Sequence, residues 1–196
     1  MLTSRMTLLI VLVFSAACTR LIPHLHNAAP IAAMTLFAAA YMPSRRWSLL
    51  LPLAAMFLSD VVLYATKDVA YREQAVSNML FVYSTFAVIA LLGQWLRQRV
   101  TVGRVIVTTL AGSSVFFWIT NFGAWLSLSQ PLSATEPALY SRTLSGLFHC
   151  YVAGVPFFRG TFCGDVVYSV ALFGGFALLE QLVPQLKPRL VEARAN

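Results

Sequence analysis

Long stretches of this chain carry no charged side chain, and they constrain the fold more than any other feature of the sequence. Of the 196 residues, 59% are hydrophobic and 11% are charged, whereas a soluble domain carries roughly a quarter charged residues. So few charges cannot cover a water-facing surface. A helix of about 20 apolar residues crosses ~30 Å of hydrocarbon. The sequence therefore predicts an all-α integral membrane protein with one transmembrane domain over 1–196.

Six apolar stretches are candidates for membrane-spanning helices. We expect them at 6–22, 28–42, 47–66, 74–96, 104–126 and 161–184. The second is the shortest, and we expect it to borrow residues from the turn before it. The segment 143–158 has no formal charge, but it is short and contains Gly154 and Pro156. It is therefore expected to be an interfacial or re-entrant piece on the outer face, because a full span needs more residues.

The N-terminal region also resembles a signal peptide. Arg5 precedes an apolar run that reaches small residues just before Cys18, as in cleaved or lipoprotein signals. The apolar run continues past Cys18 to Ile22, however. We therefore expect a first span that is retained.

The basic residues predict the orientation of the spans. Six spans with an inner N-terminus put nine of the 14 basic residues in inner segments and five in outer ones. The inner set is Arg5, Arg45, Arg46, Arg97, Arg99, Arg104, Lys187, Arg189 and Arg194; the outer set is Arg20, Lys67, Arg72, Arg142 and Arg159. Lys and Arg are enriched on the cytoplasmic side of membrane proteins. The pattern predicts N-in and C-in termini in a bacterial inner membrane, and the scattered charges argue against a nucleic-acid partner.

Polar residues concentrate toward the outer ends of these predicted spans. Ionisable side chains inside a membrane are costly, so they are usually functional or paired. Asp60 falls in the outer third of the third span, and Asp165 lies four residues into the sixth, ~6 Å from its outer end. Asn78, Tyr83 and Asn121 also fall near outer ends.

The expected outer connections add more polar groups. They are His24, His26, Asn27, Arg142, His149 and Arg159. The inner half has no comparable set, since Glu180 lies close to the cytoplasmic end. This asymmetry predicts a pocket that opens to the outside and is capped by 127–159. The alternative is that the two aspartates pair with arginines (Arg20, Arg142 or Arg159) and only hold helices together. The residues leave both interpretations open.

The sequence offers one weak candidate for a metal site. His24 and His26 are ligand types that could act with His149 or Cys150, although interfacial histidines are commonly polar caps. The three cysteines form no CxxC pair. Phosphate-loop, dinucleotide and Ser/His/Asp signatures are missing from the sequence, so we expect neither an enzyme nor an intrinsic cofactor.

Small residues recur within three of the predicted spans. They are Gly112-Ser113-Ser114, Gly174-Gly175 and the alanines of 28–33. Small side chains let helices approach closely in membranes. We interpret them as contacts within the bundle, with a docking surface for a partner protein as the alternative.

Several short motifs along the chain form a recognisable series. They are Arg20-Leu-Ile-Pro-His24, Asn27-x-x-Pro30-Ile-Ala-Ala33, Leu58-Ser-Asp60, Thr120-Asn-Phe-Gly-x-Trp125, and Cys150-Tyr-Val-Ala-Gly-x-Pro-Phe-Phe-Arg159 with Gly164-Asp165. Together they resemble a bacterial family of predicted membrane transport proteins. That family is similar to the S components of energy-coupling-factor vitamin importers and to the BtuM family of solitary cobalamin transporters. The resemblance runs from about residue 20 to about residue 180.

This resemblance implies a six-helix, S-component-like bundle that takes up a small vitamin or cofactor. Cobalamin or another corrinoid would then be the substrate, and the partner would be an energy-coupling module, or none in a solitary transporter. The cobalamin transporters have a cobalt-contacting cysteine near the start of the fourth span, whereas residues 75–83 contain none here. The expected ligand contacts are Arg20, His24, His26, Asn27, Asp60, Tyr83, Asn121, Trp125, Arg142, Arg159 and Asp165.

Other functions remain open on the sequence alone. One is a membrane enzyme acting on a lipid-like substrate, with the two aspartates as catalytic or metal-binding groups, although no paired DxxxD motif is present. Another is a component for cobalt or nickel uptake. A third is a structural subunit of a transport complex.

Overall fold

The computed structural model describes residues 4–22, 29–67, 69–131 and 137–187. For residues 69–75 it describes the backbone only. In these ranges the chain forms helices, turns and loops, and no strand. The elements are α1 (Ser4–Cys18), η1 (Thr19–Leu21), α2 (Ile31–Tyr41), α3 (Arg45–Thr66), α4 (Val69–Gln98), α5 (Val102–Leu128), α6 (Leu144–Ser169), a π-helical turn η2 (Val170–Gly174), α7 (Gly175–Leu182) and η3 (Pro184–Leu186). The prediction of an all-helical protein is confirmed.

Polar caps fix where three of the long helices begin. The hydroxyl oxygens of Ser44, Thr101 and Thr143 accept hydrogen bonds from backbone N–H groups in the first turns of α3, α5 and α6. Such caps satisfy amides that have no partner inside the helix. In the described part of the chain, five helical segments are long and apolar enough to cross a membrane. The protein is therefore compatible with several membrane passes.

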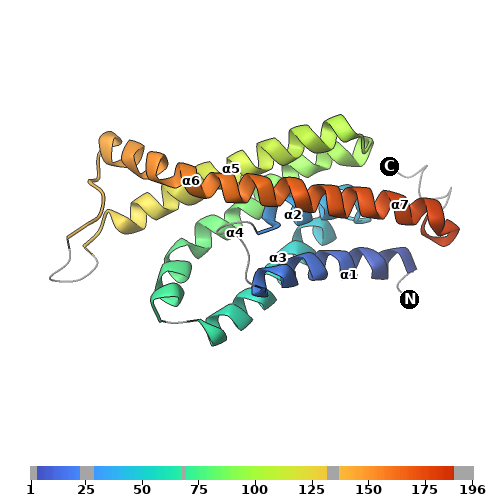
Figure 1. Ribbon diagram of the computed structural model, residues 1–196, viewed down its shortest axis with the longest axis horizontal. Helices are drawn as coiled ribbons and strands as arrows, with labels where there is room; N and C mark the ends of the chain where they lie inside the picture. Colours follow the sequence, from blue (N-terminus) through green and yellow to red (C-terminus); the bar gives the residue numbers. More distant parts are fainter. Residues whose placement is uncertain (1–3, 23–28, 68, 132–136, 188–196) are drawn as a thin grey trace.

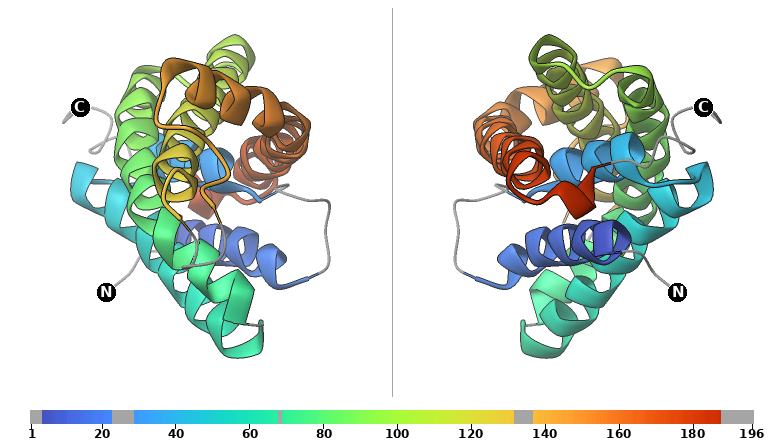
Figure 2. Two further views of the ribbon diagram at one scale, coloured as in Figure 1. Left: turned by 90° about the vertical axis from the view of Figure 1, so that its left-hand side faces the viewer. Right: turned by 90° about the vertical axis from the view of Figure 1, so that its right-hand side faces the viewer.

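The short helix α2 lies at the centre of the bundle. It contacts α1, α3, α4, α5 and α6, and every side chain from Ile31 to Ala39 is buried. Figure 2 shows α2 between the α6–α7 helix and α4, with α1 below it. Its 11 residues extend only ~16 Å. The described helix is therefore shorter than the span expected over 28–42 and covers about half of a hydrocarbon layer. Residues 23–28 lie outside the described residues.

One continuous helical segment replaces the two pieces expected over 143–184. The segment Leu144–Leu182 has 39 residues and runs along the whole molecule (Figure 1). The interpretation of 143–158 as a separate interfacial or re-entrant piece is wrong, since α6 includes it and tolerates Pro156 in its interior. At ~58 Å the segment is longer than a ~30 Å hydrocarbon layer requires.

The first and last described helices meet at the same end of the molecule. The guanidinium of Arg5 donates to the carboxylate of Glu180 and to the carbonyl oxygen of Leu186. It also lies over the rings of Tyr41 and Phe176, 5.9 and 5.1 Å from their centroids. Arg5 therefore joins α1 to the C-terminal part of α7 and η3, and Figure 1 shows the start of α1 and the end of α7 on the same side.

Close helix contacts explain some of the small residues. A Cβ added at Gly93 in α4 would lie 2.4 Å from the Cβ of Ala39, and one at Gly112 in α5 would lie 3.0 Å from that of Ala32. The packing interpretation is therefore confirmed for Gly112 and for the buried alanines of α2. It is wrong for Gly174 and Gly175, where an added Cβ would meet no atom within 4 Å.

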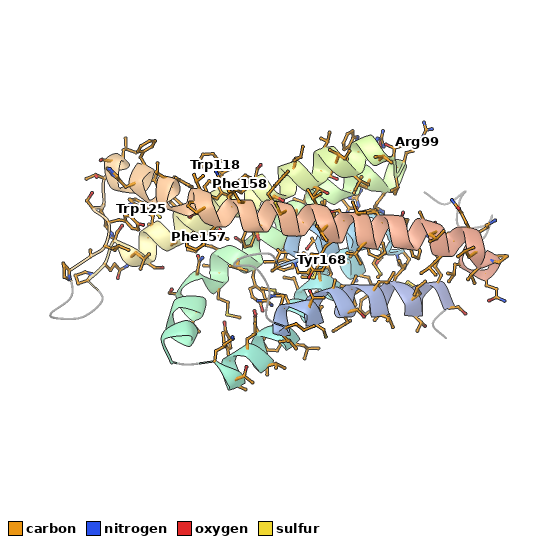
Figure 3. All side chains as sticks on the ribbon, viewed as in Figure 1. Arg99, Trp118, Trp125, Phe157, Phe158 and Tyr168 are labelled. Atoms are coloured by element: carbon orange, nitrogen blue, oxygen red, sulfur yellow. The ribbon has the colours of Figure 1, made fainter. Side chains whose placement is uncertain are left out.

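We call the two ends of the molecule the arginine-rich end and the loop end. The arginine-rich end holds the α2–α3 and α4–α5 connections, including Arg45 and Arg99. The loop end holds the connection between α5 and α6. Figure 3 shows Arg99 at one end and Trp125 toward the other.

Candidate functional site

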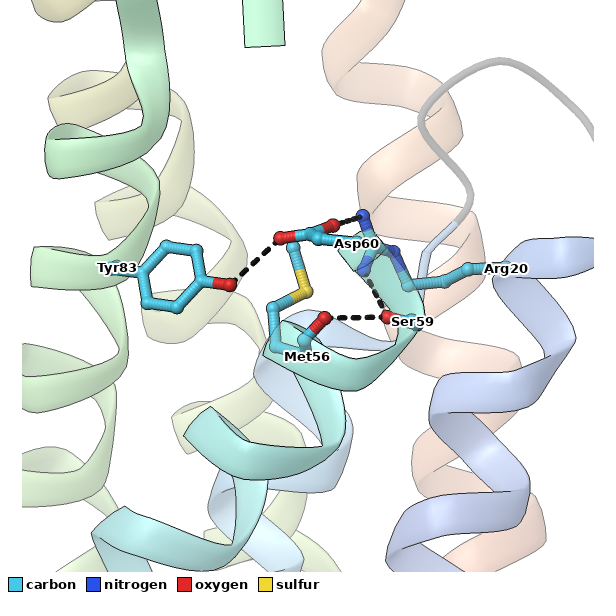
Figure 4. A network of polar contacts seen from close by, with 5 residues as sticks. All are labelled: Arg20, Met56, Ser59, Asp60 and Tyr83. Atoms are coloured by element: carbon cyan, nitrogen blue, oxygen red, sulfur yellow. Dashed lines mark hydrogen bonds and ion pairs between the residues drawn. The ribbon is translucent and has the colours of Figure 1, made fainter. Parts of the chain in front are cut away.

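A buried ionic cluster links three helices toward the loop end. Arg20 donates from Nη2 to Oδ1 of Asp60 at 2.8 Å and from Nη1 to Oγ of Ser59 at 2.5 Å. The hydroxyl of Tyr83 donates to the other Asp60 oxygen, Oδ2, at 2.8 Å. Ser59 in turn donates to the carbonyl oxygen of Met56, 2.8 Å away. Figure 4 shows the cluster, which joins η1, α3 and α4.

The burial of this pair determines its energetics. Only 10% of the Arg20 side chain and 9% of the Asp60 side chain are exposed. Removing one partner of a buried ion pair leaves an uncompensated charge and costs roughly 3–5 kcal/mol. Both carboxylate oxygens of Asp60 are already engaged by this protein's own donors. The interpretation that Asp60 pairs with an arginine to hold helices together is therefore confirmed for Asp60 and Arg20.

Asp165 is a second buried carboxylate, and its partners are neutral. Its Oδ1 accepts from the backbone N–H groups of Ala32 and Ala33 at 3.0 and 3.1 Å, and its Oδ2 accepts from the Ser113 hydroxyl at 2.7 Å. These two amides belong to the first turn of α2, where a negative charge is favourable. Asp165 has no exposed surface. It connects α6 to α2 and α5 and caps the start of α2.

The structure corrects the expected depth of Asp165. The residue lies 21 positions after Leu144, ~32 Å along the continuous helix, and not ~6 Å from a helix end. Its partner Ser113 lies nine residues after Arg104, ~14 Å along α5. Asp165 and the start of α2 are therefore deep within the bundle. The expected pairing with an arginine is also wrong for Asp165, because its described partners are amides and a hydroxyl.

Further buried hydroxyl groups lie between α5 and α6. Together with Asp165 and Ser113 they form a row of polar groups, which we call the polar seam. Toward the arginine-rich end, the hydroxyls of Thr109 and Ser169 are 2.9 Å apart and both are buried. Toward the loop end, Thr161 lies one turn before Asp165, and Thr120 lies on the facing helix; both are buried. These polar groups therefore extend from Thr109 to Thr120 along α5 and from Thr161 to Ser169 along α6.

A small pocket opens at the loop-end part of this seam. Its volume is about 30 Å³, and its lining is Phe116, Phe117, Thr120, Asn121, Gly154, Phe157, Phe158 and Thr161. Asn121 donates from Nδ2 to the carbonyl oxygen of Phe117 at 2.9 Å. Sites for small organic ligands usually measure ~300–1,000 Å³. The pocket has the aromatic and amide lining of a ligand site but not the volume of one in this conformation.

The connection after α5 is tied to its helix by Trp125. The indole Nε1 donates to the carbonyl oxygen of Ser141 at 3.1 Å. Arg142 and Arg159 are exposed, and neither forms an ion pair with another residue that the structure describes. The structure thus brings Arg20, Asp60 and Tyr83 together but leaves these two arginines outside that cluster.

The proposed metal ligands do not converge where they are described. His149 is exposed and its Nδ1 lies 2.7 Å from the Ser145 carbonyl oxygen, whereas Cys150 is buried and donates to the Asn121 carbonyl oxygen. The described part of the chain contains no group of three or more His, Cys, Asp or Glu side chains with metal-ligand geometry. His24, His26 and Asn27 lie outside the described residues.

Sequence reasoning missed the residues that complete these networks. Ser59 and Ser113 were not singled out as partners of charged groups, and Thr161 was not connected to the pocket. Ser113 was assigned only to helix packing. A useful signal was available for Thr161, because it lies four residues before Asp165 and so shares its helix face.

Comparison with known proteins yields one family and no characterised relative. No curated protein matches the chain, and neither does any solved structure. The sequence model of a family of unknown function, DUF6580, matches residues 1–186. The chain therefore belongs to the DUF6580 family.

Proposed function

We propose that this protein is a membrane transporter or substrate-capture protein of the S-component type, which takes up a small vitamin or cofactor. The loop end would face outward, and the two termini would lie in the cytoplasm of a bacterial cell. The stretch around α2 would count as one of six passes. The protein would act by binding and not by catalysis.

The meeting of α1 and α7 at one end supports this topology. Arg5 bonds to Glu180 and to the carbonyl of Leu186, so the chain starts and finishes its described helices on the same side. An even number of passes would account for this arrangement. Arg45, Arg46 and Arg99 are exposed at that same end, and a surplus of arginine is typical of a cytoplasmic face.

The short central helix α2 is the observation that carries the transport proposal. Transporters commonly build their sites where a discontinuous helix ends near the middle of the membrane, with its positive N-terminus facing a polar group. Here α2 is a half-length helix surrounded by five others, and Asp165 and Ser113 hold its N-terminus. The groups between this point and the loop end include Thr161 and Asn121 of the pocket.

The volume of the pocket indicates that ligand capture requires a conformational change. The described part of α3 makes no substantial contact with α6, since α2 lies between them. Because the pocket is lined by α5 and α6 alone, separation of these two helices at the loop end would enlarge it. The ligand would then contact Asn121 and the aromatic side chains of α5 and α6.

The resemblance described above suggests a corrinoid such as cobalamin as the first ligand to test. An energy-coupling module would be the partner if the protein is not solitary. Mass spectrometry of small molecules that co-purify with the native protein is the decisive experiment, and a visible absorption spectrum would detect a coloured corrinoid.

The expected result is one vitamin-sized molecule in near-stoichiometric amount. Repeated isolation of the intact protein with no retained small molecule, but with a stoichiometric protein partner, would instead favour the structural-subunit function. Recovery of a chemically modified lipid after incubation with membrane lipids would favour the enzyme.

A further inference from the structure

Five arginines gather at the arginine-rich end, and the transport proposal gives them no binding role. They are Arg45, Arg46, Arg97, Arg99 and Arg104. They come from two connections and from the helix turns that flank them. The two connections lie against each other, because Arg97 donates from Nη2 to the carbonyl oxygen of Pro43 at 3.0 Å. Arg45 is close enough to Arg97 for their charges to interact. The two connections therefore form one basic surface.

No described acidic side chain neutralises this surface. Asp60 pairs with Arg20, Asp165 caps α2, and Glu180 pairs with Arg5; these are the three acidic side chains that the structure describes. The helices α3 and α5 begin here, and α2 and α4 end here. The partial positive charges of the two helix N-termini and the partial negative charges of the two C-termini offset each other. The positive charge of the surface therefore comes from its arginines.

One guanidinium group of the surface has unused hydrogen-bonding capacity. Nη1 of Arg97 is buried and has no hydrogen-bond partner among the described residues. A buried donor without a partner is energetically unfavourable. Arg104, by contrast, is positioned by its stacking over the Trp95 ring, 4.7 Å from the centroid, and by bonds to the carbonyl oxygens of Trp95 and Arg99. An anion near Arg97 would satisfy the free donor.

Apolar side chains border the basic surface on the flanks of the helices. Trp47 and Trp95 are exposed, as are Leu50 and Leu91 farther along α3 and α4. Tryptophan is enriched at membrane interfaces, where its ring spans apolar and polar regions. A ligand with both an anionic head and apolar tails would match both parts, whereas a soluble anion would use only the arginines.

We propose that this surface binds the phosphate headgroup of an anionic phospholipid, whose acyl chains lie along the exposed flanks of α3 and α4. Basic pockets between transmembrane helices bind such headgroups on the cytoplasmic side. The bound lipid would link the α2–α3 connection to the α4–α5 connection. It would thereby stabilise the end of the bundle opposite the proposed ligand site.

Native mass spectrometry of the full-length protein, in micelles doped with phosphatidylglycerol or phosphatidylcholine, tests this proposal. The test variant carries Arg45→Gln, Arg46→Gln and Arg99→Gln, all at exposed positions. The matched control carries Lys67→Gln, Arg142→Gln and Arg159→Gln, which are also exposed but lie outside the basic surface. Thermal unfolding with phosphatidylglycerol, phosphatidylcholine or inorganic phosphate is measured in parallel.

The proposal predicts that the wild type retains phosphatidylglycerol in preference to phosphatidylcholine. The test variant should lose at least tenfold in that retention, since each arginine near an anionic lipid contributes roughly a fivefold effect, and the control should change less than twofold. If the triple variant is not monodisperse, Arg99→Gln alone should lose roughly fivefold.

Three results would overturn the proposal. They are equal retention of the two lipids, an equal loss in the control variant, and stabilisation by inorganic phosphate as large as that by phosphatidylglycerol. None of these bears on capture of a small molecule at the loop end, so the two proposals fail independently.

Discussion

Asp60 and Asp165 are both carboxylates buried within an apolar helical bundle, but they are stabilised in opposite ways. Asp60 has a cationic partner, Arg20, whereas Asp165 is bound by two backbone amides and the Ser113 hydroxyl. A side-chain ion pair can be replaced as a unit by apolar residues. Backbone amides at the start of a helix stay in place when side chains are replaced, unless the new residue is proline. Asp60 and Arg20 therefore connect helices in a way that an apolar pair could replace, whereas Asp165 is needed to satisfy the first backbone amides of α2.

The largest effect is expected at Asp165. Asp165→Leu would leave two amides and one hydroxyl without partners, at a cost of about 4 kcal/mol in unfolding free energy. Asp165→Asn should recover part of this loss, because an amide oxygen still accepts hydrogen bonds. Reversible unfolding in mixed micelles measures both values. Rescue of Asp165→Leu by adding Ser113→Ala would contradict the assigned role, because the α2 amides would still be unpaired.

A smaller loss is expected for the ion pair, together with a rescue. Asp60→Leu alone should cost about 3 kcal/mol, since it leaves Arg20 as a buried, unpaired charge. The double variant Arg20→Met with Asp60→Leu should recover most of that cost. A double-mutant cycle measures the coupling, and additive single effects would show that the two side chains do not interact.

The packing of α2 gives a third test of its central position. Gly93→Ala would place a Cβ 2.4 Å from that of Ala39, and overpacking of this kind costs roughly 1–3 kcal/mol. Gly174→Ala is the matched control, because its added Cβ meets no atom within 4 Å. Similar stabilities of the two variants would argue against the close approach of α4 to α2.

The smallest effect is expected where a hydroxyl group supports each carboxylate. Tyr83→Phe and Ser113→Ala should each cost about 1.5 kcal/mol, at the low end of the range for hydrogen bonds to charged groups. The cost at Ser113 should be the larger of the two, because Asp60 retains its bond to Arg20 whereas Asp165 has no cation to rely on. The reverse order, measured in the same unfolding assay, would mean that the contrast between the two sites is wrong.

Much of this architecture could be predicted from apolar patterning. The helices over 45–66, 69–98 and 102–128 agree closely with the expected stretches, because long uncharged runs of this kind have few alternatives. The shortness of α2 and the continuity of α6 through Pro156 could not be predicted. Both depend on neighbouring helices, which bury all of α2 and which decide whether an apolar segment folds back or continues.

The candidate site could be predicted only in part from the sequence. The cost of burying charge correctly indicated that Asp60 and Asp165 have partners. It did not indicate which partners, because the amides of Ala32 and Ala33 become available only where α2 begins. The expected depth of Asp165 is wrong for a related reason. The prediction measures its distance from a helix start at residue 161, whereas α6 begins at Leu144.

The central claim is that the protein captures a small molecule at its loop end, in the pocket that contains Asn121. The most direct measurement is the amount of co-purified small molecule, by mass spectrometry, for the wild type, Asn121→Leu and Arg99→Gln. We predict near-stoichiometric retention by the wild type and by Arg99→Gln, and a loss of at least tenfold in Asn121→Leu with folding intact. Equal retention by all three, or no retained small molecule in any of them, would contradict the account.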